Sequence, residues 1–199
     1  MVLYSIERIP QKKYNQQIQE SDLSYTYVDA LIRSLIECPD DNIFLIWSNL
    51  KVQDDCAERP DISGVALVDT QFKNIICVGE VKGEDKISDN HATLCDLIKI
   101  GCFSKEAIDT YSNYGILGIH VVGFQVTIYV TILLTEGLYV MQEICSIRLP
   151  TSIYDMKSFI ANIDDLLPIK TVYKKCMKNH EKVLRYKKKG AAYKEMLQY

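Results

Sequence analysis

The chain has 199 residues, of which 48% are hydrophobic and 25% are charged, a composition typical of a soluble globular protein. No apolar run approaches the roughly 18 residues that a membrane span needs, and the first residues lack the layout of a signal peptide. We therefore expect an intracellular protein of the nucleus or cytoplasm, with no membrane partner.

The net charge of −3 is unevenly distributed along the chain. Residues 170–199 contain ten Lys and Arg against two acids, so the preceding residues are strongly acidic. A basic segment of this kind can meet nucleic-acid phosphates or act as a nuclear address, and a solvated basic helix has the same composition. We expect an α/β domain over 1–169 and a basic helical extension over 170–199 that packs on this domain or trails from it.

The cysteine pattern excludes two common kinds of site. The seven cysteines are odd in number, and they form no C-x-x-C and no paired Cys/His spacing. This argues against both a zinc centre and a disulfide framework, and it fits a reducing compartment.

The first half of the chain predicts a helix followed by strands. An apolar stripe at helical spacing covers about 21–37, and a short apolar run over 42–48 predicts a strand. Two β-branched runs, Ile62–Val68 and Ile75–Lys82, predict two further strands. The link over 69–74 is short enough for these two strands to pair as an antiparallel hairpin.

The second half predicts a long helix, two strands and further helices. The helix covers about 91–111, with Gly101 as a bend or break. A β-pattern over 121–134 is answered by a second one over 137–149, and Pro150 ends the sheet. We expect a helix from residue 151 or 152 that ends around 164–168, and a basic helix from about residue 171.

Three charged residues converge in the predicted hairpin. Alternation along a strand places Glu80 and Lys82 on one face and Val81 on the other. Asp61 opens the preceding strand, and antiparallel pairing brings it beside the end of the next strand. Two carboxylates suit a hard cation such as Mg²⁺, and a neighbouring ammonium can orient an attacking water.

The pattern Pro60-Asp61, an intervening strand, and Glu80-x-Lys82 resembles the PD-(D/E)xK nuclease superfamily. The resemblance implies an α/β, restriction-endonuclease-like core of order αβββαβ, a mixed central sheet flanked by helices. Here we expect strand 124–133 to complete this core, with one extra antiparallel strand at 138–147 and C-terminal helices.

The resemblance also implies roles for individual residues. Asp61 and Glu80 would bind Mg²⁺, or Mn²⁺ as a substitute, with the Val81 carbonyl as a further ligand, and Lys82 would position the attacking water. Glu20 is the candidate for an additional acid from the first helix. Its alternative role is that of a first-turn acid favoured by the helix dipole.

Two lysines are candidates for nucleic-acid binding. Lys86 follows the motif, and Lys99 lies on the predicted long helix. For Lys99, the alternative is an ion pair on the surface with Asp96, three residues earlier.

Three functions remain open at this point. The first is a Mg²⁺-dependent nuclease acting on DNA. A homodimer is compatible with this function, because cutting both strands often uses two sites. The second is an inactive module of the same fold that binds nucleic acid or a protein. The third is an unrelated α/β interaction domain in which Glu80 and Lys82 form an exposed pair.

Overall fold

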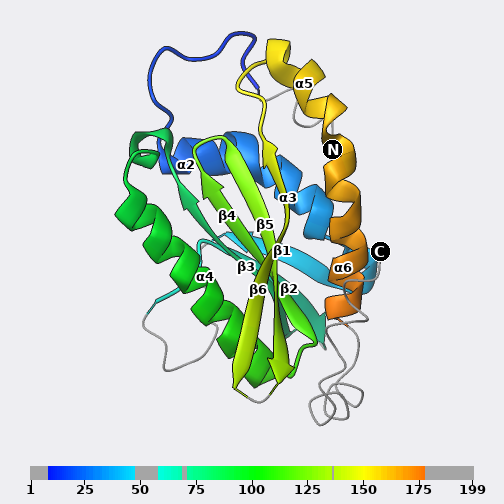
Figure 1. Cartoon of the computed structure of the whole chain (residues 1–199). Helices are drawn as coiled ribbons and strands as arrows, with labels where there is room; N and C mark the ends of the chain where they lie inside the picture. The colour runs from blue at the N-terminus through cyan, green and yellow to red at the C-terminus, as the bar shows by residue number, and fades with distance from the viewer. Residues whose placement is uncertain (1–8, 48–57, 69–70, 136, 178–199) are drawn as a thin grey trace.

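A mixed sheet of six strands forms the centre of the fold, with helices on both faces (Figure 1). The computed structural model describes residues 9–47, 58–68, 71–135 and 137–177. The strands lie in the sheet in chain order: β1 (Ile43–Trp47), β2 (Ile62–Val68), β3 (Gln71–Lys82), β4 (Gly115–Val122), β5 (Gln125–Thr135) and β6 (Leu138–Arg148). Strands β3 and β4 are parallel, and every other neighbouring pair is antiparallel.

The predicted hairpin of β2 and β3 is confirmed, but β3 begins earlier than its apolar run. The ladder continues to the pair Val68 and Gln71, so the link is shorter than the expected 69–74. Ladder hydrogen bonds come from the backbone and do not require apolar side chains. The polar residues before Ile75 therefore extend the strand.

Helix α4 (Asn90–Tyr111) connects the parallel strands β3 and β4 and covers one face of the sheet (Figure 1). The Asp89 carboxylate caps its start by accepting a hydrogen bond from the Ala92 N–H at 3.0 Å. The expected break at Gly101 does not occur, because the helix is continuous over 22 residues. Its inner side packs against the sheet through a core of residues Val65, Ile75, Val78, Ile100, Phe103, Ala107, Ile108 and Ile116.

The apolar run over 121–134 divides into two strands, which corrects the predicted end of the core. Strand β4 ends at Val122, and Gly123 turns the chain with a φ of +55° before β5 begins. A left-handed backbone of this kind favours glycine. The strand that follows α4 is therefore β4 rather than 124–133, and both β5 and β6, instead of one strand, add to the antiparallel edge.

The other face of the sheet is covered by the first helices and the last one (Figure 1). The first unit consists of α2 (Glu20–Leu23), a π-helical turn (Ser24–Val28) and α3 (Asp29–Ile36). The last consists of α5 (Met156–Ala161) and α6 (Leu167–Cys176). Short 3₁₀ turns lie at Pro39–Asp41, Glu84–Lys86, Ile153–Asp155 and Ile163–Leu166.

Helix α6 crosses the expected boundary between residues 169 and 170. Pro168 lies in its first turn, where a missing N–H is tolerated, so this proline begins a helix instead of ending one. Ile169, Val172 and Tyr173 are buried in the core shared with α3 and β4. Most of the predicted basic extension, 178–199, lies outside the described residues. None of the helices in the described part of the chain combines the length and apolarity needed to cross a membrane.

Candidate functional site

Strand pairing brings Asp61 to the end of β3. Ile62 lies opposite Gly79, so Asp61, one residue earlier, lies beside Glu80 and Val81. The Val81 N–H donates a hydrogen bond to Asp61 Oδ2 at 2.9 Å. Burial raises the pKa of Asp61, although this hydrogen bond and the Lys82 ammonium oppose the rise.

Glu80 is the most deeply buried carboxylate of the motif. Only 3% of the residue is exposed, and its Oε1 has no hydrogen-bond partner among the described residues. Burial, followed by the charges of Asp61 and Asp96, raises the pKa of Glu80 to about 8. A carboxylate in this position needs a proton or a cation to balance its charge.

Asp96 belongs to this site, which the sequence did not predict. It lies on the inner side of α4 with its side chain 3% exposed, and its Oδ2 lies 3.0 Å from Lys82 Nζ. The ion pair of Asp96 with Lys99 is present, with Lys99 Nζ 3.8 Å from Asp96 Oδ1. It is not a pair between two surface residues, because only Lys99 is exposed and the Asp96 side chain faces the sheet. The apolar spacing of α4 gave little sign of this orientation, since Leu94 and Ile98 are exposed instead.

Lys82 is held as a cation by its neighbours. Burial alone would lower the pKa of its ammonium, but the contact with Asp96 outweighs burial and the pKa is raised. Lys82 Nζ also lies 3.7 Å from Glu20 Oε2 and 3.5 Å from the Val81 carbonyl oxygen. The side chain remains 21% exposed, so it lies between the buried acids and the solvent.

Glu20 reaches the site because the segment before α2 docks on the loop after β3. The Glu84 N–H donates to the Ile18 carbonyl at 2.8 Å, and the Ile18 N–H donates to Glu84 Oε2 at 3.0 Å. These two bonds hold Glu20, the first residue of α2, next to Lys82. Burial raises the pKa of the Glu20 carboxyl, and Lys82 partly opposes this. Glu20 is therefore both an acid in the first turn of a helix and a neighbour of the motif, the two roles considered for it.

His120 is a second residue that sequence reasoning missed. It lies directly opposite Glu80 in the parallel ladder of β3 and β4, is 7% exposed, and its Nε2 lacks a hydrogen-bond partner in the described part of the chain. Burial lowers its pKa, which favours the neutral imidazole. A lone histidine within an apolar run gives no signal in the sequence, because the pairing of β3 with β4 decides its position.

A pocket of about 460 Å³ opens beside Lys82. Its lining residues are Gln19, Glu20, Lys82, Asp85, Lys86, Asp89 and Ala92. Lys86 lies at this opening with its Nζ 3.7 Å from Asp85 Oδ2. The side chains of Lys86 and Lys99 are 52% and 38% exposed, so both ammonium groups are accessible to a ligand.

The donor set at this end of the sheet suits a hard cation that keeps some of its waters. Within the described residues, no group of three or more His, Cys, Asp or Glu side chains is placed to enclose an ion. Magnesium, however, commonly binds through one or two carboxylates and retains several waters. Asp61 and Glu80, with the Val81 carbonyl beside them, match this need, and the unpartnered Glu80 Oε1 is an oxygen that such an ion would satisfy.

Comparison with protein-family models, with curated proteins and with solved structures finds no match for this chain. The inference of function therefore depends on the chemistry of the described residues and on the resemblance of the motif.

Proposed function

We propose that this protein is a metal-dependent nuclease that hydrolyses phosphodiester bonds in DNA. The observation that carries the proposal is the juxtaposition of Asp61, the buried Glu80 and Lys82 at the ends of two paired strands. Two carboxylates and an ammonium at this spacing are the groups that PD-(D/E)xK nucleases use.

The order of elements supports the same proposal. A helical unit (α2 to α3) precedes three antiparallel strands (β1 to β3), and α4 then leads to β4, which is parallel to β3. This order is similar to the αβββαβ order of the restriction-endonuclease-like core. The motif lies on the second and third strands of that order, where the resemblance requires it.

The chain's own residues divide the chemistry among them. A divalent ion held by Asp61 and Glu80 would neutralise charge on the phosphate and lower the pKa of a water. Lys82 is protonated at neutral pH, so it donates hydrogen bonds that orient the water and stabilise developing negative charge. Asp96 holds the Lys82 ammonium in place from the side of α4.

The charge of the site distinguishes this function from that of an inactive binding module. Glu20, Asp61 and Asp96, joined by Glu80 once it loses its proton, outnumber Lys82 and Lys99, and a phosphodiester brought close to these acids is repelled. Nucleic acid should therefore bind at this end only when a cation is present. A module that uses another surface would bind equally well in a chelator.

Cleavage of DNA tests the proposal. Supercoiled DNA, linear DNA, single-stranded DNA and RNA are incubated with the full chain in Mg²⁺, in Mn²⁺ and in EDTA. We expect cleavage of at least one substrate with either metal, none in EDTA, and a loss of at least about 100-fold in Asp61→Asn, Glu80→Gln and Lys82→Ala, as expected for groups that act together.

Matched controls remove the same charges elsewhere. Asp164→Asn and Lys157→Ala change exposed residues in the C-terminal helical region and should cleave like the wild type. Cleavage that survives in the three motif variants would show that another centre or a contaminant is responsible. Metal-independent DNA binding without cleavage would favour the inactive module.

A further inference from the structure

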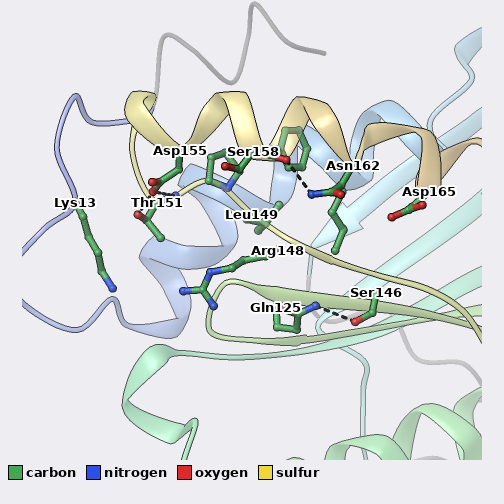
Figure 2. A pocket seen from close by; sticks show the side chains of 13 residues that line it. Lys13, Gln125, Ser146, Arg148, Leu149, Thr151, Asp155, Ser158, Asn162 and Asp165 are labelled. Atoms are coloured by element: carbon green, nitrogen blue, oxygen red, sulfur yellow. Dashed lines mark hydrogen bonds between the residues drawn. The ribbon is translucent and has the colours of Figure 1, made fainter.

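A second pocket borders the same end of the sheet, at the edge strand β6 (Figure 2). It has a volume of about 680 Å³. Its polar lining includes Lys13, Gln125, Ser146, Arg148, Thr151 and Ser158. No sequence motif marks these residues, because they come from the N-terminal segment, two strands, the segment after β6 and α5.

Strand register aligns this pocket with the motif. Lys82 lies opposite Val122 on β4, and Val122 lies opposite Gln125 on β5. Gln125 in turn lies opposite Arg148 on β6. Side chains of residues directly opposite one another project from the same face of the sheet. The side chains of Lys82 and Arg148 therefore project from one face, in one row across the strands. Three strand spacings of about 4.8 Å separate their backbones by about 14 Å.

The row of residues next to this one carries polar side chains. In the neighbouring row, Glu80 lies opposite His120, His120 opposite Thr127, and Thr127 opposite Ser146. The Thr127 and Ser146 hydroxyls lie 3.0 Å apart, and the Gln125 amide donates to Ser146 Oγ at 2.9 Å (Figure 2). Polar side chains therefore continue from the buried Glu80 and His120 to Thr127 and Ser146 at β6.

One end of the pocket gathers two cations. Arg148 is exposed and makes no hydrogen bond or ion pair with any other described residue. Figure 2 shows the guanidinium of Arg148 and the ammonium of Lys13 pointing toward one another across this end. Lys13 Nζ lies 3.3 Å from Glu84 Oε1, and Glu84 follows Lys82 by two residues. The cationic end therefore borders the loop that carries the motif.

Asp155 and Asp165 also line the pocket. Asp155 Oδ2 accepts hydrogen bonds from the Thr151 N–H at 3.2 Å, from the Thr151 hydroxyl and from the Ser152 hydroxyl at 3.3 Å. Asp165 lies at the opposite end of the pocket from Lys13 (Figure 2). Lys13 is paired with Glu84, whereas Arg148 has no acidic partner among the described residues. The guanidinium of Arg148, with Lys13 facing it, is therefore the group that suits an anion with several acceptor oxygens.

We propose that Lys13 and Arg148 bind a backbone phosphate of the nucleic-acid strand whose scissile phosphodiester lies at Asp61 and Glu80. This inference rests on the proposed nuclease function and adds a second contact to it. The separation of about 14 Å is longer than the step between neighbouring phosphates of one strand, so the two contacts fall on different phosphates of the same strand. A strand shorter than this distance cannot occupy both places.

Binding to strands of two lengths tests the proposal. Fluorescence anisotropy in Mg²⁺ uses labelled DNA of two and of ten nucleotides, with the full chain carrying Lys82→Ala so that cleavage is blocked and both carboxylates remain. Adding Arg148→Gln should raise Kd for the ten-nucleotide strand about 5- to 20-fold and reduce the slope of log Kd against log salt by about one. Binding of the dinucleotide should not change.

Two further variants control for charge and geometry. Lys157→Gln removes one exposed cation from α5 outside the pocket lining and should leave the Kd of the long strand nearly unchanged. Arg148→Lys should recover part of the binding, because it restores the charge but not the paired donors of a guanidinium. An Arg148→Gln protein that binds the long strand as well as Lys157→Gln does would overturn the proposal, as would equal weakening for the dinucleotide.

Cleavage kinetics separate this inference from the proposed function. With the catalytic residues intact, Arg148→Gln should raise KM for the ten-nucleotide strand and leave hydrolysis of bis(p-nitrophenyl) phosphate unchanged. If the wild type cleaves DNA but Arg148→Gln does not change binding of the long strand, the phosphate contact is refuted and the nuclease function stands. If the wild type cleaves no substrate but Arg148→Gln still weakens binding of the long strand, the nuclease function is refuted and the phosphate contact stands.

Discussion

At the scale of single residues, Glu80 has the most unusual environment. Burial and the neighbouring Asp61 and Asp96 raise its pKa to about 8, against 4.5 for an ordinary glutamate. Between these two pH values the folded chain keeps a proton that the unfolded chain releases, so the free energy of unfolding falls as pH rises. His120, whose pKa is lowered by burial, acts in the opposite sense but only below its ordinary value of 6.5.

We predict a pH-dependent stability that Glu80→Gln removes. In EDTA, the free energy of unfolding of the wild type should fall by about 1 kcal/mol between pH 7 and pH 8.5. The amide in Glu80→Gln cannot titrate, so this variant should show a flatter curve over the same range. Urea denaturation at several pH values measures both proteins, and parallel curves would show that Glu80 is already ionised at pH 7.

The motif residues could be predicted from the sequence, whereas their neighbours could not. Asp61, Glu80 and Lys82 follow from strand alternation and one hairpin, both of which are local. Asp96 and His120 reach the same place only because α4 and β4 pack against β3, contacts that depend on the whole fold. The 22-residue helix looked amphipathic, but its sequence did not show which side would face the sheet.

At the scale of elements, Gly83 marks the point where the first helical segment meets the motif loop. A Cβ at Gly83 would lie 2.9 Å from the Glu20 nitrogen and 3.0 Å from the Ile18 oxygen. We predict that Gly83→Ala destabilises the protein by about 1–3 kcal/mol, because backbone atoms must shift. The shift should also displace Glu20 from Lys82. Thermal and urea unfolding measure the change, and an unaltered stability would mean that this docking is loose.

At Gly101, in contrast to Gly83, an alanine would fit without any clash. A Cβ at this position meets no atom within 4 Å, and the helix is continuous through it. Gly101→Ala should therefore stabilise the protein by about 0.5–1 kcal/mol, because alanine has the higher helix propensity and loses less backbone entropy on folding. A destabilised variant would show that this side of α4 is covered in solution.

The boundary between β4 and β5 could not be located from the apolar pattern of the sequence. The apolar run over 121–134 appeared to be one strand because Gly123 and Phe124 continue it without a polar interruption. The structure turns at Gly123, whose N–H donates to the Lys82 carbonyl at 2.8 Å. A single glycine in an apolar run signals a turn or a bulge equally well, and only the pairing of β4 with β5 decides between them.

At the scale of the whole molecule, α6 belongs to the same core as the sheet. Ile169 is fully buried, whereas Lys170 beside it is exposed. Ile169→Ala should lower the free energy of unfolding by about 2–5 kcal/mol, and Lys170→Ala should change it by less than about 0.5 kcal/mol. Equal, small effects of both variants would indicate that α6 is a separate appendage.

The α/β class and the order of elements up to the long helix followed from the sequence, whereas the mixed sheet was an implication of the resemblance. The extent of the antiparallel edge did not follow, because the number of strands after α4 depended on the turn at Gly123. The sequence showed an acidic segment before residue 170 and a basic one after it. This distribution of charge did not indicate that Lys13 and Arg148 line one pocket. These two residues are 135 positions apart in the chain and line the same pocket only in the folded molecule.

Binding of Mn²⁺, measured by isothermal titration calorimetry, tests most directly the claim that Asp61 and Glu80 form a cation site. The wild type should bind Mn²⁺, Mg²⁺ should compete for the same site, and binding should strengthen from pH 7 to pH 8.5 as Glu80 loses its proton. Asp61→Asn and Glu80→Gln should each abolish binding, while Asp164→Asn should preserve it. Wild-type affinity in the two motif variants, or no binding by the wild type in this pH range, would contradict the account.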